Sequence, residues 1–218
     1  MMKKKMVSTL KDIKGIRRFL IWFYLIGVAG MLLPVSSELF ILLTPLALLM
    51  NFGLLMLHHL SGYNLKTILV FSFIFISGFV VEIIGVQTGI IFGNYTYGSG
   101  LGIKIMDTPV LIGMNWLLLI YTTGSIVQNI KISPFLRIAS GTGMMLIYDF
   151  VLEHVAPKMN MWSWENNIVP MNNYVSWCLV ALVFHSLIEI FGIKLKNPLS
   201  IIILVTQFLF FVVLYLFM

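Results

Sequence analysis

The sequence is poor in charged residues and nearly free of cysteine. Only 10% of its 218 residues are Asp, Glu, Lys or Arg, whereas soluble domains contain roughly a quarter. Its one cysteine, Cys178, excludes an internal disulfide and a metal site built from four cysteines. Cys178 lies among apolar residues, where a small buried side chain is a simpler interpretation than a catalytic thiol. Because 60% of the chain is hydrophobic, a water-soluble fold would leave much apolar surface exposed.

Several motifs of membrane enzymes and receptors are also missing. The four histidines show neither the H-x-x-H spacing of di-iron histidine boxes nor an H-E-x-x-H zinc motif. No D-x-x-x-D cluster is present to hold magnesium and a diphosphate, which argues against a prenyltransferase. The last apolar stretch has no lysine for a retinal Schiff base. The sequence therefore predicts no metal and no cofactor.

Seven apolar stretches are each close to the ~20 residues that a helix needs to cross a bilayer. We therefore predict an all-α, polytopic helical bundle with residues 1–18 as a basic cytoplasmic segment and 19–218 as a single transmembrane domain. No soluble domain remains, so any chemistry takes place in the membrane or at its surface. The predicted spans are 19–35, 39–57, 67–93, 110–127, 135–155, 174–193 and 199–218.

The basic residues predict how the chain lies in the membrane. Lysine and arginine near span ends are retained on the cytoplasmic side, and 12 of the 14 would lie on one side of a seven-span chain. This places the N-terminus in the cytoplasm, in a multi-pass protein of the inner or plasma membrane. The net charge of +6 indicates contact with anionic lipids rather than nucleic acid. The twelve are Lys3, Lys4, Lys5, Lys11, Lys14, Arg17, Arg18, Lys66, Lys131, Arg137, Lys194 and Lys196, and the exceptions are Lys104 and Lys158.

Four of the eight acidic residues lie inside predicted spans: Glu82, Asp149, Glu153 and Glu189. Ionisable groups are costly in hydrocarbon, so each is a candidate functional residue. The predicted spans offer almost no basic partner for Glu82, which favours a functional role over a structural ion pair.

Two pairs of polar residues are spaced by four, which places each pair on one helix face. Asp149 and Glu153 form the first pair, and two close carboxyls in a low dielectric do not easily both ionise, so one is expected to stay protonated. Alternatively, Glu153 simply marks the aqueous end of its helix. His185 and Glu189 form the second pair, and we expect them to hydrogen-bond each other.

Glycine and aromatic residues gather between the predicted spans. Gly85, Gly89 and Gly93 form a stripe against which a neighbouring helix could pack closely. Tyr95 and Tyr97 follow it, and Trp162 and Trp164 lie in the next loop on the same side. An aromatic belt at the membrane interface would also explain these side chains.

The motifs around these glycine and aromatic residues resemble those of a known family. The pattern Glu82-x2-Gly85-x2-Thr88-Gly89-x2-Phe92-Gly93-x-Tyr95-x-Tyr97, followed by Leu101-Gly102, Pro109 and Trp116, resembles the membrane carotenoid-biosynthesis family that includes the CruF-type carotenoid 1,2-hydratases. Tyr148-Asp149, Glu153, Ala156, Trp162-x-Trp164 and Asn173-Tyr174-x2-Trp177 are similar to it as well.

The resemblance implies a cofactor-independent enzyme that adds water to the terminal 1,2 double bond of an acyclic carotenoid end group. We expect Glu82, Asp149 and Glu153 to be catalytic, with Asp149 or Glu82 donating the proton. The substrate would enter from the lipid between helices, along the glycine stripe. The residues expected to line the substrate site are Tyr95, Tyr97, Asn115, Trp116, Trp162, Trp164 and Tyr174.

The alternative is a small proton-coupled membrane transporter, for which buried acids are equally natural. Such carriers usually contain an internal repeat, and the two halves of this sequence show none. The expected partners are a lipophilic carotenoid, membrane lipids and, as further candidates, other enzymes of the carotenoid pathway.

Overall fold

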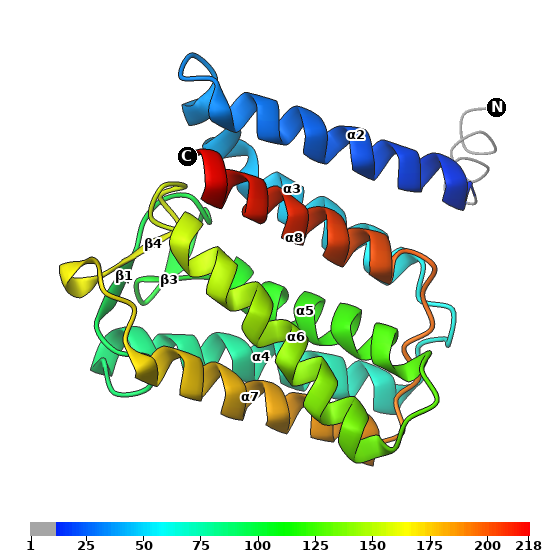
Figure 1. Ribbon diagram of the computed structural model, residues 1–218. Coiled ribbons are helices and arrows are strands. Elements are labelled where there is room, and N and C mark those ends of the chain that lie inside the picture. The colour runs from blue at the N-terminus through cyan, green and yellow to red at the C-terminus, as the bar shows by residue number, and fades with distance from the viewer. Residues whose placement is uncertain (1–11) are drawn as a thin grey trace.

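The computed structural model describes residues 12–218 and contains seven helices long and apolar enough to cross a membrane (Figure 1). The predicted helical membrane bundle is therefore confirmed. Lys3, Lys4, Lys5 and Lys11 lie outside the described residues. The seven helices are α2 (Ile13–Leu32), α3 (Ser37–Leu57), α4 (Leu65–Thr88), α5 (Leu111–Gln128), α6 (Pro134–Val155), α7 (Met171–Ile190) and α8 (Ser200–Phe217).

Local capping explains where these helices differ from the predicted spans. Asp12 caps α2 by accepting a hydrogen bond from the Gly15 amide at 3.0 Å, so the helix begins six residues before position 19. The predicted boundary between residues 18 and 19 consequently falls inside α2. Gly89 follows the last residue of α4 in the left-handed conformation, with φ of 65°, so the helix ends five residues before the predicted end at Gly93.

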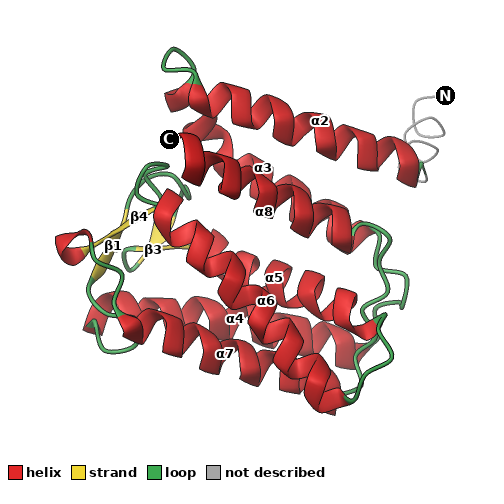
Figure 2. Cartoon of the chain, viewed as in Figure 1, coloured by secondary structure: helices red, strands yellow, loops and turns green. Residues whose placement is uncertain are grey.

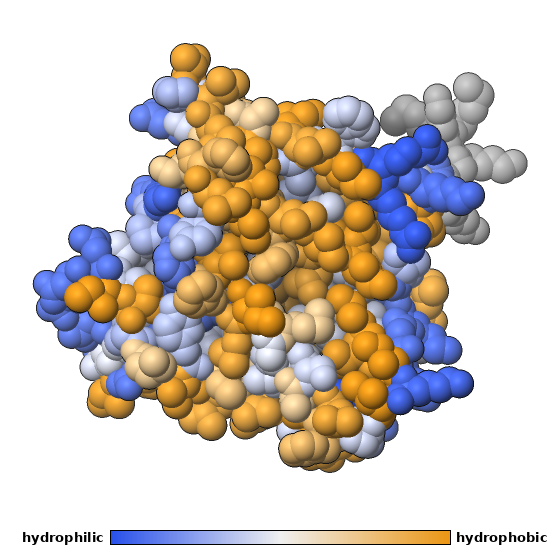
Figure 3. Space-filling model, in the orientation of Figure 1, coloured by the Kyte–Doolittle hydropathy of each residue, from blue (hydrophilic) through white to orange (hydrophobic). Residues whose placement is uncertain are grey.

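Helix α5 lies at the centre of the bundle. Fifteen of its 18 residues are buried, and it packs against α3, α4, α6, α7 and α8. Helix α2 is peripheral and packs mainly along α3 and α8 (Figure 1). The helices around α5 expose large apolar side chains on their outer faces. Examples are Trp22 on α2, Leu46 on α3 and Phe73 on α4. Figure 3 shows this apolar surface between two hydrophilic ends, as expected for a multi-pass membrane protein.

The described basic residues separate by end as predicted. The Arg17 guanidinium, near the start of α2, donates to the Pro198 carbonyl at 2.6 Å, between α7 and α8. The Leu60 amide, between α3 and α4, donates to the Lys196 carbonyl at 2.9 Å. These contacts hold the start of α2, the α3–α4 loop and the α7–α8 loop together at one end, whereas Lys104 and Lys158 lie in connections at the opposite end. Assignment of the basic end to the cytoplasm remains a prediction from charge.

Two short ribbons lie at the end opposite the basic loops, where the sequence indicated only loops (Figure 2). Strand β1 (Tyr95–Tyr97) pairs antiparallel with β4 (Trp162–Trp164), and β2 (Lys104–Ile105) pairs antiparallel with β3 (Thr108–Pro109). A single 3₁₀ turn, η1 (Glu165–Asn167), follows β4. The β1–β4 ribbon thus ties the α4–α5 connection to the α6–α7 connection.

The predicted contact between His185 and Glu189 is wrong. The His185 ring instead lies 3.2 Å from the Thr123 hydroxyl of α5, and Glu189 forms a 3.0 Å ion pair with Arg137 at the start of α6. Although the spacing places both on one side of α7, each side chain meets a different neighbouring helix. Glu189 therefore has a basic partner, whereas the other three acids inside the spans form no ion pair with any residue in 12–218.

Candidate active site

Glu82 is buried in α4, six residues before the end of that helix. Its Oε2 accepts hydrogen bonds from the hydroxyls of Tyr95, at 2.7 Å, and Tyr97, at 2.8 Å. Its Oε1 accepts one from the indole N–H of Trp116 in α5, at 3.0 Å. Three donors from two segments therefore surround one carboxyl group, which compensates for its removal from water.

Glu153 in α6 has a second shell of three donors. The indole N–H groups of Trp162 and Trp164 donate to its Oε2 at 2.9 and 2.6 Å. The Asn173 amide of α7 donates to its Oε1 at 2.9 Å. An indole N–H can only donate, so Oε2 of Glu153 serves as an acceptor for both. The alternative that Glu153 merely marks an aqueous helix end is wrong, because its side chain is buried.

The β1–β4 ribbon explains how one small element serves both acids. Successive side chains of a strand point to opposite faces, and the register pairs Tyr95 with Trp164 and Tyr97 with Trp162. All four rings are buried on one face, while the intervening residues of the two strands are exposed on the other. The tyrosines reach Glu82 and the tryptophans reach Glu153, so the ribbon links the two carboxyls.

The tyrosine hydroxyls of this ribbon remain protonated donors. Burial raises the pKa of Tyr95 and of Tyr97 well above the usual phenol value, and the nearby Glu82 carboxylate raises both further. Lys104 donates to the Tyr97 carbonyl and fixes the ribbon backbone beside this cluster. The two phenols thus present fixed O–H dipoles to Glu82.

Asp149 is fully buried one turn before Glu153 and is less well satisfied. Its Oδ2 accepts from the Asn173 amide at 3.2 Å, the same group that donates to Glu153. Its Oδ1 has no hydrogen-bond partner among the described residues. A buried ionised oxygen without a donor is strongly unfavourable, so this geometry favours the neutral acid at Asp149. Asn173 bridges the two carboxyls and holds them as a coupled pair.

A cavity of about 10 Å³ lies between Glu82 and Glu153. Its walls include the four ribbon rings, Asn173 and Phe92, and none of the described residues that line it is basic. Trp177 of α7 also lines it and stacks on Trp116, with ring centroids 4.1 Å apart. This space is about what the centre of one water molecule occupies. The cavity therefore combines two carboxyls with electron-rich ring faces.

Most of the predicted site residues come together here. Glu82, Glu153, Tyr95, Tyr97, Trp162 and Trp164 line the cavity, and Trp116 and Asp149 each hydrogen-bond a residue that lines it. Asn115 is buried but lines a neighbouring cavity of about 20 Å³.

Tyr174 is not among the residues that line either cavity. It is half-buried, and its ring packs beside Phe150, with centroids 6.2 Å apart. The sequence prediction missed Asn173 and Trp177, which do line the cavity. Their spacing of four places them on one face of α7, whereas Tyr174 is turned by about 100°. The described residues contain no group of three His, Cys, Asp or Glu side chains able to hold a metal ion.

Comparison with known proteins assigns the chain to a family. Residues 40–218 match the family described as carotenoid biosynthesis protein, which is most of the chain and includes every site residue described above. The chain belongs to this carotenoid biosynthesis family. No solved structure matches it.

One similar protein is the bisanhydrobacterioruberin hydratase of Haloarcula japonica. The two sequences are 30% identical over an alignment of 115 residues, which covers 47% of this chain and 38% of the relative. The matched part therefore spans well under half of that protein. Together with membership of the carotenoid biosynthesis family, this similarity supports a role in carotenoid biosynthesis.

Proposed function

We propose that this protein is an enzyme that adds water to the terminal 1,2 double bond of an acyclic carotenoid end group. The observation that carries the proposal is the pair of buried carboxyls, Glu82 and Glu153, joined across a small cavity by one aromatic ribbon. The relative's name, a bisanhydrobacterioruberin hydratase, supports the same reaction class.

The reaction requires one proton donor, one proton acceptor and one water. A carboxylic acid protonates C2 of the isopropylidene group, the carbon bearing the hydrogen, so the π electrons form the new C2–H bond and leave a tertiary cation at C1. Water then forms the C1–O bond, and its second proton passes to a carboxylate. The sum is the addition of one water with no change in oxidation state, and return of the proton from the accepting carboxyl to the donating carboxyl completes the cycle.

The geometry supports different roles for the carboxyls. Asp149 and Glu153 share Asn173, and the donor-poor Asp149 favours one proton on this pair. Asp149 holds this proton at rest, and Glu153, which lines the cavity whereas Asp149 does not, delivers it to the substrate. Glu82 lies across the cavity with three neutral donors, an arrangement suited to a carboxylate that stabilises the cation and receives the proton from water.

The aromatic walls serve the cation rather than the alkene. A cation is attracted to the face of Trp or Tyr within about 6 Å of the ring centroid. Tyr95 and Trp164 lie with their centroids 4.9 Å apart on one wall, and the Trp116–Trp177 stack lies nearby. Enclosure by these rings also limits the supply of water, so that the site admits few competing nucleophiles.

The place of action is part of the proposal. The basic end of the bundle would face the cytoplasm of a cell membrane, with the carboxyls toward the opposite leaflet. The substrate would be a carotenoid dissolved in the bilayer, supplied by the enzymes that build and desaturate its chain. Contact with anionic lipid would stabilise the basic end.

The test is expression of the full chain in a host that accumulates lycopene, with pigments analysed by chromatography and mass spectrometry. We expect a more polar product, heavier by one water per modified end, with an unchanged visible chromophore. A Glu82→Gln variant present in the membrane at the same level should give little product. The matched control is Glu38→Gln, which replaces an exposed acid outside the site. Unchanged lycopene, γ-carotene and other acyclic carotenoids in membranes that contain the folded protein would refute the hydratase proposal.

A further inference from the structure

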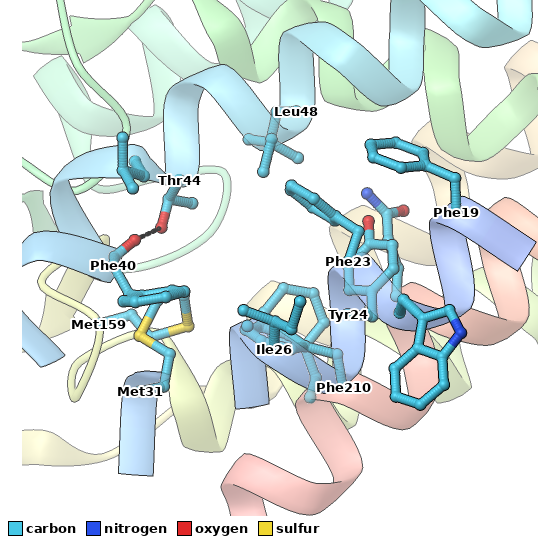
Figure 4. Close-up of a pocket in the computed structure, with 16 residues that line it drawn as sticks. Phe19, Phe23, Tyr24, Ile26, Met31, Phe40, Thr44, Leu48, Met159 and Phe210 are labelled. Carbon is cyan, nitrogen blue, oxygen red and sulfur yellow. Dashed lines mark hydrogen bonds between the residues drawn. The ribbon is translucent and has the colours of Figure 1, made fainter. Parts of the chain in front are cut away.

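An apolar groove lies between the peripheral helix α2 and helices α3 and α8 (Figure 4). Its volume is about 230 Å³, compared with about 10 Å³ for the cavity between the acids and about 20 Å³ for the cavity beside Asn115. Lining residues on α2 extend from Phe19 to Met31, a length of about 18 Å at 1.5 Å per residue. In Figure 4, Phe23, Tyr24, Phe40, Leu48 and Phe210 surround its open centre.

The lining matches a hydrocarbon. The few polar groups are mostly engaged with the protein: the Thr44 hydroxyl donates to the Phe40 carbonyl, and the Tyr24 hydroxyl accepts from Asn51 at 2.8 Å. The buried Oε1 of Gln207 has no hydrogen-bond partner among the described residues. Aromatic rings and branched carbons form the rest of the wall, as in sites for long apolar ligands.

The groove adjoins the candidate active site through shared walls. Leu48 and Phe211 line both the groove and the cavity of about 20 Å³ that contains Asn115. Ile112 and Trp162 line both that middle cavity and the cavity between the acids. Side chains only one layer thick therefore separate the lipid-facing groove from the middle cavity, and the middle cavity from Glu153.

The glycine stripe of α4, by contrast, is not open to a ligand. A Cβ on Gly85 would lie 2.5 Å from the Phe92 ring, and one on Gly93 would lie 2.4 Å from Pro170. Gly85 makes room for Phe92 of the connection that follows α4, and Gly93 makes room for Pro170 at the start of α7, so neither leaves space for a substrate. The predicted entry along this stripe is therefore wrong.

We propose that the α2–α3–α8 groove binds the polyene chain of the carotenoid and directs its end group through the middle cavity toward Glu153. This inference rests on the proposed function for the identity of the ligand. The end group would pass between Leu48 and Phe211 and reach the cation site beside Trp162. The rest of the chain, longer than the groove, would extend into the surrounding lipid, which explains why the groove is open on its outer side.

The test fills the groove without touching the acids. Ala47 of α3 lines it, and Ala47→Trp places an indole in a space that has room for one. Ala29→Trp adds the same bulk to the exposed face of α2 outside the groove and is the matched control. Leu43→Trp, from a second lining position that is partly exposed, guards against a folding defect particular to Ala47→Trp.

Each protein is purified in mild detergent from lycopene-accumulating cells, and bound pigment is measured by its visible absorbance per protein. Phospholipid content, thermal stability and hydrated product are measured on the same samples. We expect Ala47→Trp and Leu43→Trp to retain at least tenfold less pigment than the wild type and to form correspondingly less product. Ala29→Trp should match the wild type in both.

Two results would overturn the groove assignment: wild-type protein that retains no pigment, or groove-filled variants that are stable and retain as much pigment as the wild type. Phospholipid that remains bound while pigment retention is insensitive to both substitutions would identify the groove as a lipid site. Pigment lost from both groove variants without any hydrated product in the wild type would support the groove and refute the hydratase. Equal hydration by the wild type and both groove variants would do the reverse.

Discussion

Replacement of Glu82 by glutamine separates the charge of this residue from its hydrogen bonds. In the Glu82→Gln variant the new amide oxygen can accept from the Trp116 indole, as Oε1 of Glu82 does at 3.0 Å. The new amide N–H groups can donate to the hydroxyls of Tyr95 and Tyr97, because each phenol oxygen can accept as well as donate. All three contacts are thereby kept, with the two tyrosine bonds reversed in direction.

The expected effects on stability and activity therefore differ. Because the hydrogen bonds are kept and a buried charge is removed, we expect the free energy of unfolding to change by about 1 kcal/mol or less. Loss of one preorganised electrostatic contact to a transition state typically lowers the rate by about 10²–10³-fold, or roughly 3–4 kcal/mol. Glu82→Ala, in contrast, leaves three buried donors unsatisfied at about 1–3 kcal/mol each and should impair folding itself.

The assay is the initial rate of hydrated product in membranes, divided by the amount of folded protein, together with thermal unfolding in detergent. Glu38→Gln removes one acid at an exposed position and should leave both quantities unchanged. A Glu82→Gln variant that is both stable and fully active would refute the role given to this carboxyl. A variant that is inactive only because it unfolds would show that the charge of Glu82 is structural.

Three further predictions follow from the ribbon, the helix contacts and the charge pattern. Trp164→Phe removes one of two indole donors from Glu153 and should cost about 1.5–3 kcal/mol in stability or transition-state binding, measured by thermal unfolding and by the rate of hydrated product. Ser163→Ala, on the exposed face of the same strand, should change neither quantity. Gly78→Ala places a Cβ 2.8 Å from that of Trp116 and should lower stability by about 1–3 kcal/mol in thermal unfolding, while Gly143→Ala, with nothing within 4 Å, should not; equal stabilities would contradict the packing. A reporter that is active only outside the cytoplasm should be active when it is fused after residue 218. Activity of a reporter that works only in the cytoplasm, fused at the same position, would invert the proposed orientation.

Several residues of the site could be predicted from the sequence, because their residue type alone marks them as candidates. An acid within an apolar stretch has few stable environments, so Glu82, Asp149 and Glu153 were recognisable before any contact was known. Their distinct roles were not, because they depend on which donors reach each oxygen. Asn173 decides this for two of the acids, whereas the sequence motif points to its neighbour Tyr174, and one residue along a helix changes the face by about 100°.

The β1–β4 ribbon shows the limit of local reasoning most clearly. Its strands are three residues long and their paired positions lie more than 60 residues apart, so no local pattern specifies the pairing. The alternation Tyr-Thr-Tyr and Trp-Ser-Trp was visible, but an interfacial aromatic belt accounted for it equally well. Only pairing turns the four rings to one side and places their donors on two carboxyls.

The sequence by itself determined the seven spans, the separation of basic residues by end and the family resemblance. These follow from the length of each hydrophobic stretch, the charges beside it and residue motifs, all of which are local properties of the sequence. The tertiary structure alone decided that Glu189 pairs with Arg137, that the glycine stripe is filled, and that an apolar groove of α2, α3 and α8 adjoins the acids. Those features depend on how helices far apart in the chain pack against one another, and hydropathy carries no information about neighbours.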